Sequence, residues 1–202
     1  MHPISVDDPC GIRVAENRYR DIMNISRPCT DDAPSWYPYF FNLVPGDDLI
    51  SALINNKRKM LELINSVPLS AENFRYATDK WTIKQVFIHL VDEERYYTYK
   101  AFCYSRRIDV NLEIPKGDAY SSDFNASKRT LKDIGEEFSA VREATLSLFK
   151  NMTMDMLDFK DFPGKEIYSA RSLGWFTVGH NIHHCSVIEK EYLGDWPKFM
   201  LH

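Results

Sequence analysis

The sequence predicts an all-α protein, a four-helix bundle that follows an irregular N-terminal extension. Three observations support this fold class. Apolar residues recur every three or four positions in four long stretches, which is the spacing of helices with one buried face. Capping residues precede these stretches, and proline or glycine follows them. The segments between them show little periodicity, which is typical of the connections between bundle helices.

The first part of the chain is the least regular. We expect residues 1–35 to form a partly irregular extension and residues 36–202 to form the bundle domain. Prolines at positions 3, 9, 28, 34, 38 and 45 interrupt any long helix, and the sequence allows only a short helical piece over residues 14–23. We interpret the aromatic run 36–41 as an extended anchor whose rings pack on the domain, with a stacking platform for a ligand as the alternative.

The first two helices have clear boundaries. An aspartate at position 47 or 48 can cap the first helix, and Pro68 ends it. The second helix begins at a capping box, because Thr82 is followed three residues later by Gln85. Trp81, just before it, is placed to act as a hydrophobic staple, and the helix should run to residue 106 or 107. Its expected seam contains Ile83, Phe87, Leu90, Tyr97, Ala101 and Tyr104.

The last two helices follow long connections. Asp123 or Asn125 can cap the third helix, and Arg142 lies off its apolar stripe. That stripe contains Leu131, Ile134, Phe138, Val141, Thr145 and Leu148. The fourth helix should begin near Ser169 and end at Gly194. Its expected inward stripe contains Leu173, Thr177, His180, His184, Val187 and Glu191.

The composition excludes several classes of protein. Hydrophobic residues make up 44% of the 202-residue chain and charged residues 27%, as in soluble globular domains. The net charge of −4 argues against a broad nucleic-acid surface, which needs basic residues to neutralise phosphates. No apolar run reaches the roughly 18 residues of a membrane helix, and no secretory signal is visible. We therefore expect a cytoplasmic protein without membrane contact, whose four scattered cysteines are thiols.

The histidines are unevenly distributed. The chain has six, and three of them, His180, His183 and His184, fall within residues 179–184. His89 is the only other histidine away from the chain ends. His180 and His184 occupy stripe positions at which the other helices place mostly apolar residues. Because burying an imidazole without partners is costly, this placement needs an explanation.

A metal site explains why His180 and His184 lie on the inward stripe. His180 and His184 are four residues apart, so they share one helix face and can bind one cation at about 2.0–2.1 Å. His89, on another helix, can supply a third imidazole, although a hydrogen-bonded core histidine is the alternative for His89 alone. Three neutral nitrogens leave a coordination position open, which is typical of catalytic sites. His183 is expected to orient a neighbour or contact another helix, and the alternative is that it replaces His184 as a ligand.

Glu93 lies one turn beyond His89 and is a candidate to orient a ligand or to act as a catalytic base. The alternative is a solvated or ion-paired glutamate. A zinc-protease site of the HExxH type is excluded, because Asn181 occupies the position at which that motif places its glutamate.

Two segments resemble the DinB/YfiT-like metalloenzyme family. Residues 80–86 together with 89–95 resemble its second-helix signature, and residues 179–184 its fourth-helix signature. Residues 39–49 are similar to the usual lead-in to its first helix, so the resemblance covers about residues 36–193. It implies an up-down-down-up bundle, a homodimer, and a divalent ion, nickel or zinc, held by His89, His180 and His184. The first 35 residues have no counterpart in the family.

The resemblance also implies an activity. Some relatives are thiol-dependent transferases or isomerases that use low-molecular-weight thiols such as bacillithiol or mycothiol. Our first hypothesis is therefore a metal-dependent S-transferase with a small-molecule substrate. The second is a hydrolase with metal-activated water as nucleophile, for which Glu93 or Glu94 is the candidate base. The contrasting class is a non-catalytic bundle that is stapled by the metal or binds a small molecule or partner without chemistry.

Overall fold

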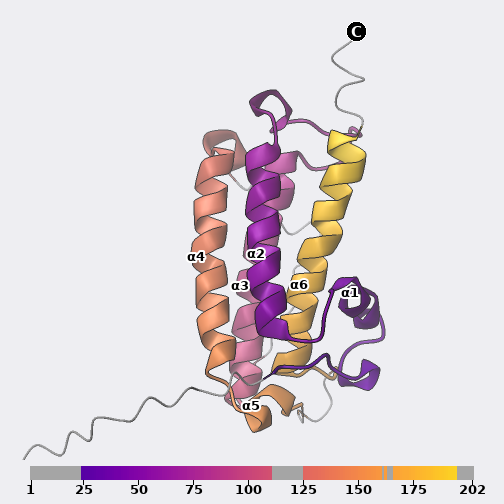
Figure 1. Ribbon diagram of the computed structural model, residues 1–202, viewed down its shortest axis with the longest axis vertical. Coiled ribbons are helices and arrows are strands. Elements are labelled where there is room, and N and C mark those ends of the chain that lie inside the picture. The colour runs from indigo at the N-terminus through magenta and orange to yellow at the C-terminus, as the bar shows by residue number, and fades with distance from the viewer. Residues whose placement is uncertain (1–23, 111–124, 161, 163–165, 195–202) are drawn as a thin grey trace, which may run out of the picture.

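The computed structural model describes residues 24–110, 125–160, 162 and 166–194. Every regular element within these ranges is helical, so the predicted all-α fold is confirmed. Four long helices, α2 (Leu49–Ser66), α3 (Ile83–Ser105), α4 (Leu131–Lys150) and α6 (Ala170–Val187), run side by side (Figure 1). The short helix α1 (Tyr37–Leu43) lies against α6, and α5 (Met154–Asp158) lies at one end of the bundle.

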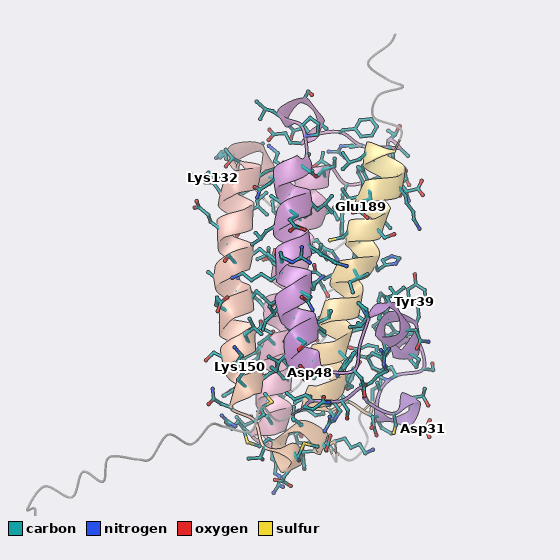
Figure 2. All side chains as sticks on the ribbon, in the orientation of Figure 1. Asp31, Tyr39, Asp48, Lys132, Lys150 and Glu189 are labelled. Carbon is teal, nitrogen blue, oxygen red and sulfur yellow. The ribbon has the colours of Figure 1, made fainter. Side chains whose placement is uncertain are left out.

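The ends of the long helices can be followed in Figure 2. Asp48, before α2, and Lys150, at the end of α4, lie toward one end of the bundle. Lys132, in the first turn of α4, and Glu189, beyond α6, lie toward the other end. Helix α3 packs against both α4 and α6. In the described ranges no helix is both long and apolar enough to cross a membrane.

Three of the four predicted helix starts are confirmed. The Asp48 carboxylate accepts a hydrogen bond from the Ser51 amide at 2.9 Å and caps α2. Thr82 and Gln85 form the predicted capping box of α3. Ser169 caps α6. These local signals therefore fix where α3 and α6, the helices that carry the internal histidines, begin.

The predicted start of the third helix is wrong. Helix α4 is capped by Thr130, which forms reciprocal hydrogen bonds with Asp133. Asn125 instead adopts a left-handed conformation (φ 55°) before the single turn η4 (Ala126–Lys128). Asp123, the other candidate cap, lies outside the described residues. Thr130 and Asp133 satisfy the free backbone N–H groups at the start of α4, whereas Asn125 makes no side-chain capping bond.

The aromatic run 36–41 is not extended as predicted. Most of it forms α1, because Pro38 falls in the first helical turn, where its missing N–H costs nothing. Its rings nevertheless pack on the domain: the Tyr37 ring stacks on Phe176 of α6 at a centroid distance of 4.1 Å. This close approach depends on Gly179, since an added Cβ would collide with the carbonyl oxygen of Phe40.

The fourth helix reaches Gly194 as predicted, but its last turns are not α-helical. After Val187 it continues as the π-helical segment η5 (Ile188–Leu193). Because a π-turn contains more residues than an α-turn, the 3.6-residue count fails there. Glu191, placed on the inward stripe, is in fact exposed, whereas Tyr192 is buried.

The buried face of α4 matches the predicted stripe at Ile134, Phe138 and Thr145 but differs from it at two places. Arg142, expected off the stripe, is completely buried while Val141 is only partly buried, and Phe149 replaces Leu148 in the core. The Arg142 guanidinium donates to both carboxylate oxygens of Glu94 at 2.7 and 2.8 Å. It also donates to the Leu53 carbonyl and to Asn56. The sequence pattern therefore places Arg142 on the polar face of the helix, although its side chain lies in the core.

The described part of the N-terminal extension packs on the bundle. Ile25 is 1% exposed, and its carbonyl oxygen accepts a hydrogen bond from the Trp175 indole at 3.3 Å. The Arg27 guanidinium donates to the carbonyl oxygens of Val44 and Gly46. Residues 24–27 thus hold the α1–α2 connection against α6. The short helix expected over residues 14–23 lies outside the described residues.

Candidate metal centre

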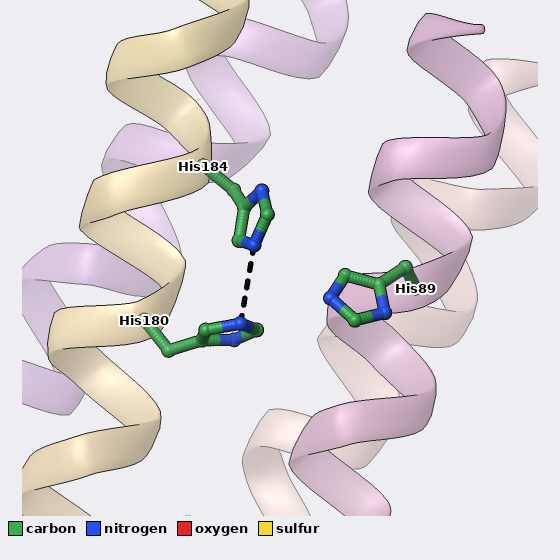
Figure 3. A group of neighbouring side chains, drawn as sticks. All are labelled: His89, His180 and His184. Carbon is green, nitrogen blue, oxygen red and sulfur yellow. Dashed lines mark hydrogen bonds between the residues drawn. The ribbon is translucent and has the colours of Figure 1, made fainter. Parts of the chain in front are cut away.

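The structure brings His89, His180 and His184 together between α3 and α6. One ring nitrogen from each lies within 4.8 Å of those of the other two. His180 and His184 extend from successive turns of α6, and His89 faces them from α3 (Figure 3). The Nε2 atoms of His180 and His184 are 3.1 Å apart. We call these three residues the histidine cluster.

The geometry of the histidine cluster fits a divalent cation. Two nitrogens that bind one ion tetrahedrally at about 2.0–2.1 Å lie about 3.3 Å apart. The 3.1 Å separation of the two Nε2 atoms is close to this value. The ring centroid of His89 lies 5.3 Å from that of His180 and 5.1 Å from that of His184, so the third imidazole is within reach of the same point.

The environment keeps the cluster uncharged. Burial lowers the pKa of His89 to about 4. Burial and the neighbouring imidazoles lower the pKa of His184 to about 3 and that of His180 well below its usual value. Neutral imidazole is the form that binds a metal, so at neutral pH no proton has to leave before an ion enters.

Aromatic side chains fix the orientation of two of the imidazoles. The His180 ring stacks on Phe176 at 5.3 Å with an interplanar angle of 20°. Phe176 is itself held by the Tyr37 ring of α1. The His89 ring lies 4.8 Å from the indole of Trp81. Ligand side chains with little freedom lose little entropy when an ion binds.

His183 is bonded to α1 and is not one of the converging residues. Its Nδ1 atom is hydrogen-bonded to the Tyr39 hydroxyl of α1 at 3.0 Å. The set of converging nitrogens contains His184 and does not contain His183. The arrangement therefore matches the expected contact of His183 with another helix, and Tyr39 is the partner that the sequence could not identify.

The two candidate acidic residues are both engaged. Glu93 is 5% exposed and is hydrogen-bonded to Tyr97, whose ring packs on Phe176 at 4.5 Å. Glu94 is bound on both oxygens by Arg142 and also accepts a hydrogen bond from the Thr145 hydroxyl at 2.8 Å. Glu94 is therefore part of the buried ion pair and not of the histidine cluster.

Sequence reasoning missed the aromatic neighbours of the cluster. The sequence predicts only a helix staple at Trp81, yet the Trp81 ring contacts His89. The predicted inward stripe does not contain Phe176, although the His180 ring stacks on it. The signal for Phe176 was its spacing, since it lies four residues before His180 on the same helix.

Comparison with known proteins supports this fold. The chain aligns with YfiT from Bacillus subtilis with a TM-score of 0.63 and 15% sequence identity, over 81% of this chain and 90% of that one. YfiT is described as a probable metal-dependent hydrolase with an unusual four-helix bundle topology. No curated protein matches the sequence. The sequence matches the DinB superfamily over residues 52–188, which is more than half of the chain. The chain therefore belongs to the DinB superfamily.

Proposed function

We propose that this protein is a divalent-metal-dependent enzyme whose ion is held by His89, His180 and His184. The observation that carries the proposal is the convergence of three uncharged imidazoles within 4.8 Å. An all-imidazole set suits zinc and nickel, which are the proposed ions. The description of YfiT as a probable metal-dependent hydrolase supports a metal in this fold.

Our first candidate reaction is the transfer of a small thiol to an electrophilic small molecule. A divalent ion supplies Lewis acidity and lowers the pKa of a thiol or water that it binds. A thiol activated in this way needs no further base. The carboxylates favour this reading, because Glu94 is tied to Arg142 and Glu93 is hydrogen-bonded to Tyr97. Burial raises the pKa of the Cys185 thiol to about 12, which disfavours this residue as the nucleophile.

The second candidate is hydrolysis, which is favoured by the description of YfiT. Activation of water by a general base requires a group that can accept its proton. Glu93 is the proposed base or orienting group, because it lies one turn from His89 on the same helix. To serve as base its carboxylate has to exchange the bond with Tyr97 for one with the nucleophile.

One assay separates the two reactions. Protein loaded with Ni²⁺ or Zn²⁺ is tested for conjugation of several thiols to electrophiles and for hydrolysis of small esters, beside His180→Ala. Thiol conjugation that exceeds the His180→Ala level supports transfer. Ester hydrolysis that is lost in both His180→Ala and Glu93→Gln supports the hydrolase. If neither reaction exceeds the His180→Ala level, both candidates are rejected.

Four further proposals concern the architecture and the location of the protein. An up-down-down-up order of the long helices is the proposed topology, and the ends labelled in Figure 2 support the directions that it gives to α2, α4 and α6. The division into an extension (residues 1–35) and a bundle domain (residues 36–202) stays a prediction from sequence. The cytoplasmic location is also a prediction from sequence. The homodimer rests on the family resemblance alone, and sedimentation equilibrium of the purified protein tests it.

A further inference from the structure

A hollow of about 300 Å³ lies beside the histidine cluster, and His184 is part of its lining. A larger hollow of about 540 Å³ lies between α2 and α6, but its lining includes none of the three cluster residues. A molecule in the smaller hollow therefore meets the histidine cluster at His184, the one cluster residue in its lining. We call the smaller hollow the Trp81 pocket.

The Trp81 pocket has aromatic walls. Trp81, Tyr76 and Tyr192 all line it. The Tyr192 hydroxyl donates to the Trp81 carbonyl oxygen at 2.9 Å, so its polar end is already bonded. The rings of Tyr76 and Tyr192 meet edge-on at 4.8 Å. These three side chains offer ring faces and edges of fixed orientation, which bind planar apolar groups.

The π-helical segment η5 places Tyr192 in this wall. Tyr192 is 2% exposed, whereas its neighbour Glu191 is exposed. In the predicted α-helical register, Glu191 would have been on the inward stripe. Such π-turns are frequent at functional sites because they redirect side chains. Here the change of register puts an aromatic ring, in place of a carboxylate, in the wall of the pocket.

The charged side chains of the pocket do not favour one sign of ligand charge. Lys80 and Asp79 both line it, and their charged atoms are 3.6 Å apart. Both side chains are exposed, so this pair is weak and screened by solvent. Selectivity therefore has to come from the aromatic walls. A volume near the lower end of the range for ligand sites suits a single ring with a short substituent.

We propose that the Trp81 pocket binds the substrate of this enzyme, and that the substrate is a small aromatic molecule whose reactive group reaches the histidine cluster. This inference rests on the proposed function. Trp81 is then a specificity-determining residue, because its indole lies between the pocket and the His89 ring.

The test compares two metal-binding probes that differ only in the aromatic ring. Benzohydroxamate and acetohydroxamate are titrated calorimetrically into Ni²⁺-loaded protein after the metal content has been measured. Because the ring gains stacking and burial, benzohydroxamate should bind at least about tenfold more tightly. Trp81→Leu should reduce this preference to about threefold or less when the affinities of both probes are compared per bound Ni²⁺. Tyr76→Leu should also reduce the preference for benzohydroxamate. Agreement between the two variants shows that the loss of preference does not come from misfolding of Trp81→Leu.

Trp36→Leu is the matched control. Trp36 is 44% exposed and does not line the pocket, so the preference should persist in this variant. Equal affinity of the two probes for the metal-loaded protein would overturn the inference and leave the metal site standing. A preference that survives in both Trp81→Leu and Tyr76→Leu would also overturn it. Failure of the protein to retain Ni²⁺ would instead reject the proposed function, and the inference with it.

Discussion

Helix α3 carries buried polar clusters on two sides. Glu94 bonds to Arg142 of α4, whereas His89 faces His180 and His184 of α6. In the first cluster opposite charges meet, and the arginine also donates to Leu53 and Asn56. In the second, three uncharged bases converge. A matched ion pair is complete by itself, but imidazoles that converge on one point gain most when a cation joins them. The comparison thus separates a structural cluster from a candidate functional one.

The largest effect is expected from breaking the ion pair. Arg142→Met leaves the Glu94 carboxylate buried without its cation and should lower the free energy of unfolding by about 3–5 kcal/mol. Urea denaturation of the metal-free protein measures this change in the free energy of unfolding. The matched control is Arg58→Met, which removes an exposed pair with Glu62 and should cost less than about 0.5 kcal/mol. Similar losses in both variants would contradict the assignment of the Arg142 pair as a structural centre.

A smaller loss of stability is expected from a substitution at the contact between α1 and α6. In Gly179→Ala, the added Cβ collides with the carbonyl oxygen of Phe40, so α1 must move away from α6. We expect a loss of about 1–3 kcal/mol in the free energy of unfolding. In the control Gly135→Ala, the nearest contact is an ordinary 3.5 Å to the Ile64 side chain, and the higher helix propensity should make the change neutral or stabilising. Equal stabilities of the two variants would show that α1 is not anchored through Gly179.

The smallest effect concerns the pH dependence of the metal-free protein. The pKa of His89 is lowered to about 4 in the folded chain from about 6.5 in the unfolded chain. Below about pH 6.5 the unfolded state therefore binds a proton that the folded state excludes, and stability falls as the pH drops toward 4. Between pH 7 and pH 5, wild type should lose about 1–2 kcal/mol more than His89→Gln. Identical losses would show that burial does not shift the pKa of His89.

The sequence predicted the features that depend on local chemistry. Thr82 with Gln85 and Ser169 mark helix starts because capping is decided within a few residues. The i, i+4 spacing of His180 and His184 placed both on one face, and the structure brings them to His89. The ligand role of these three residues stays a prediction until metal is measured.

Features that depend on tertiary packing were not predictable in this way. Arg142 is on the seam of α4 because Glu94 faces it from another helix, and the sequence alone does not indicate that pairing. The partner of His183 is Tyr39, which is 144 residues away in the chain. The π-helical η5 shifted Glu191 and Tyr192 relative to the expected register. In the first two cases a contact between distant segments decides the local arrangement.

The central claim, a divalent ion held by the histidine cluster, is tested most directly by metal content. Wild type, His89→Ala and His183→Ala are purified gently in parallel, and nickel and zinc are measured per chain by elemental analysis. We predict one divalent ion per chain in wild type and in His183→Ala, and only background in His89→Ala. No ion in wild type, or equal content in wild type and His89→Ala, would contradict the account.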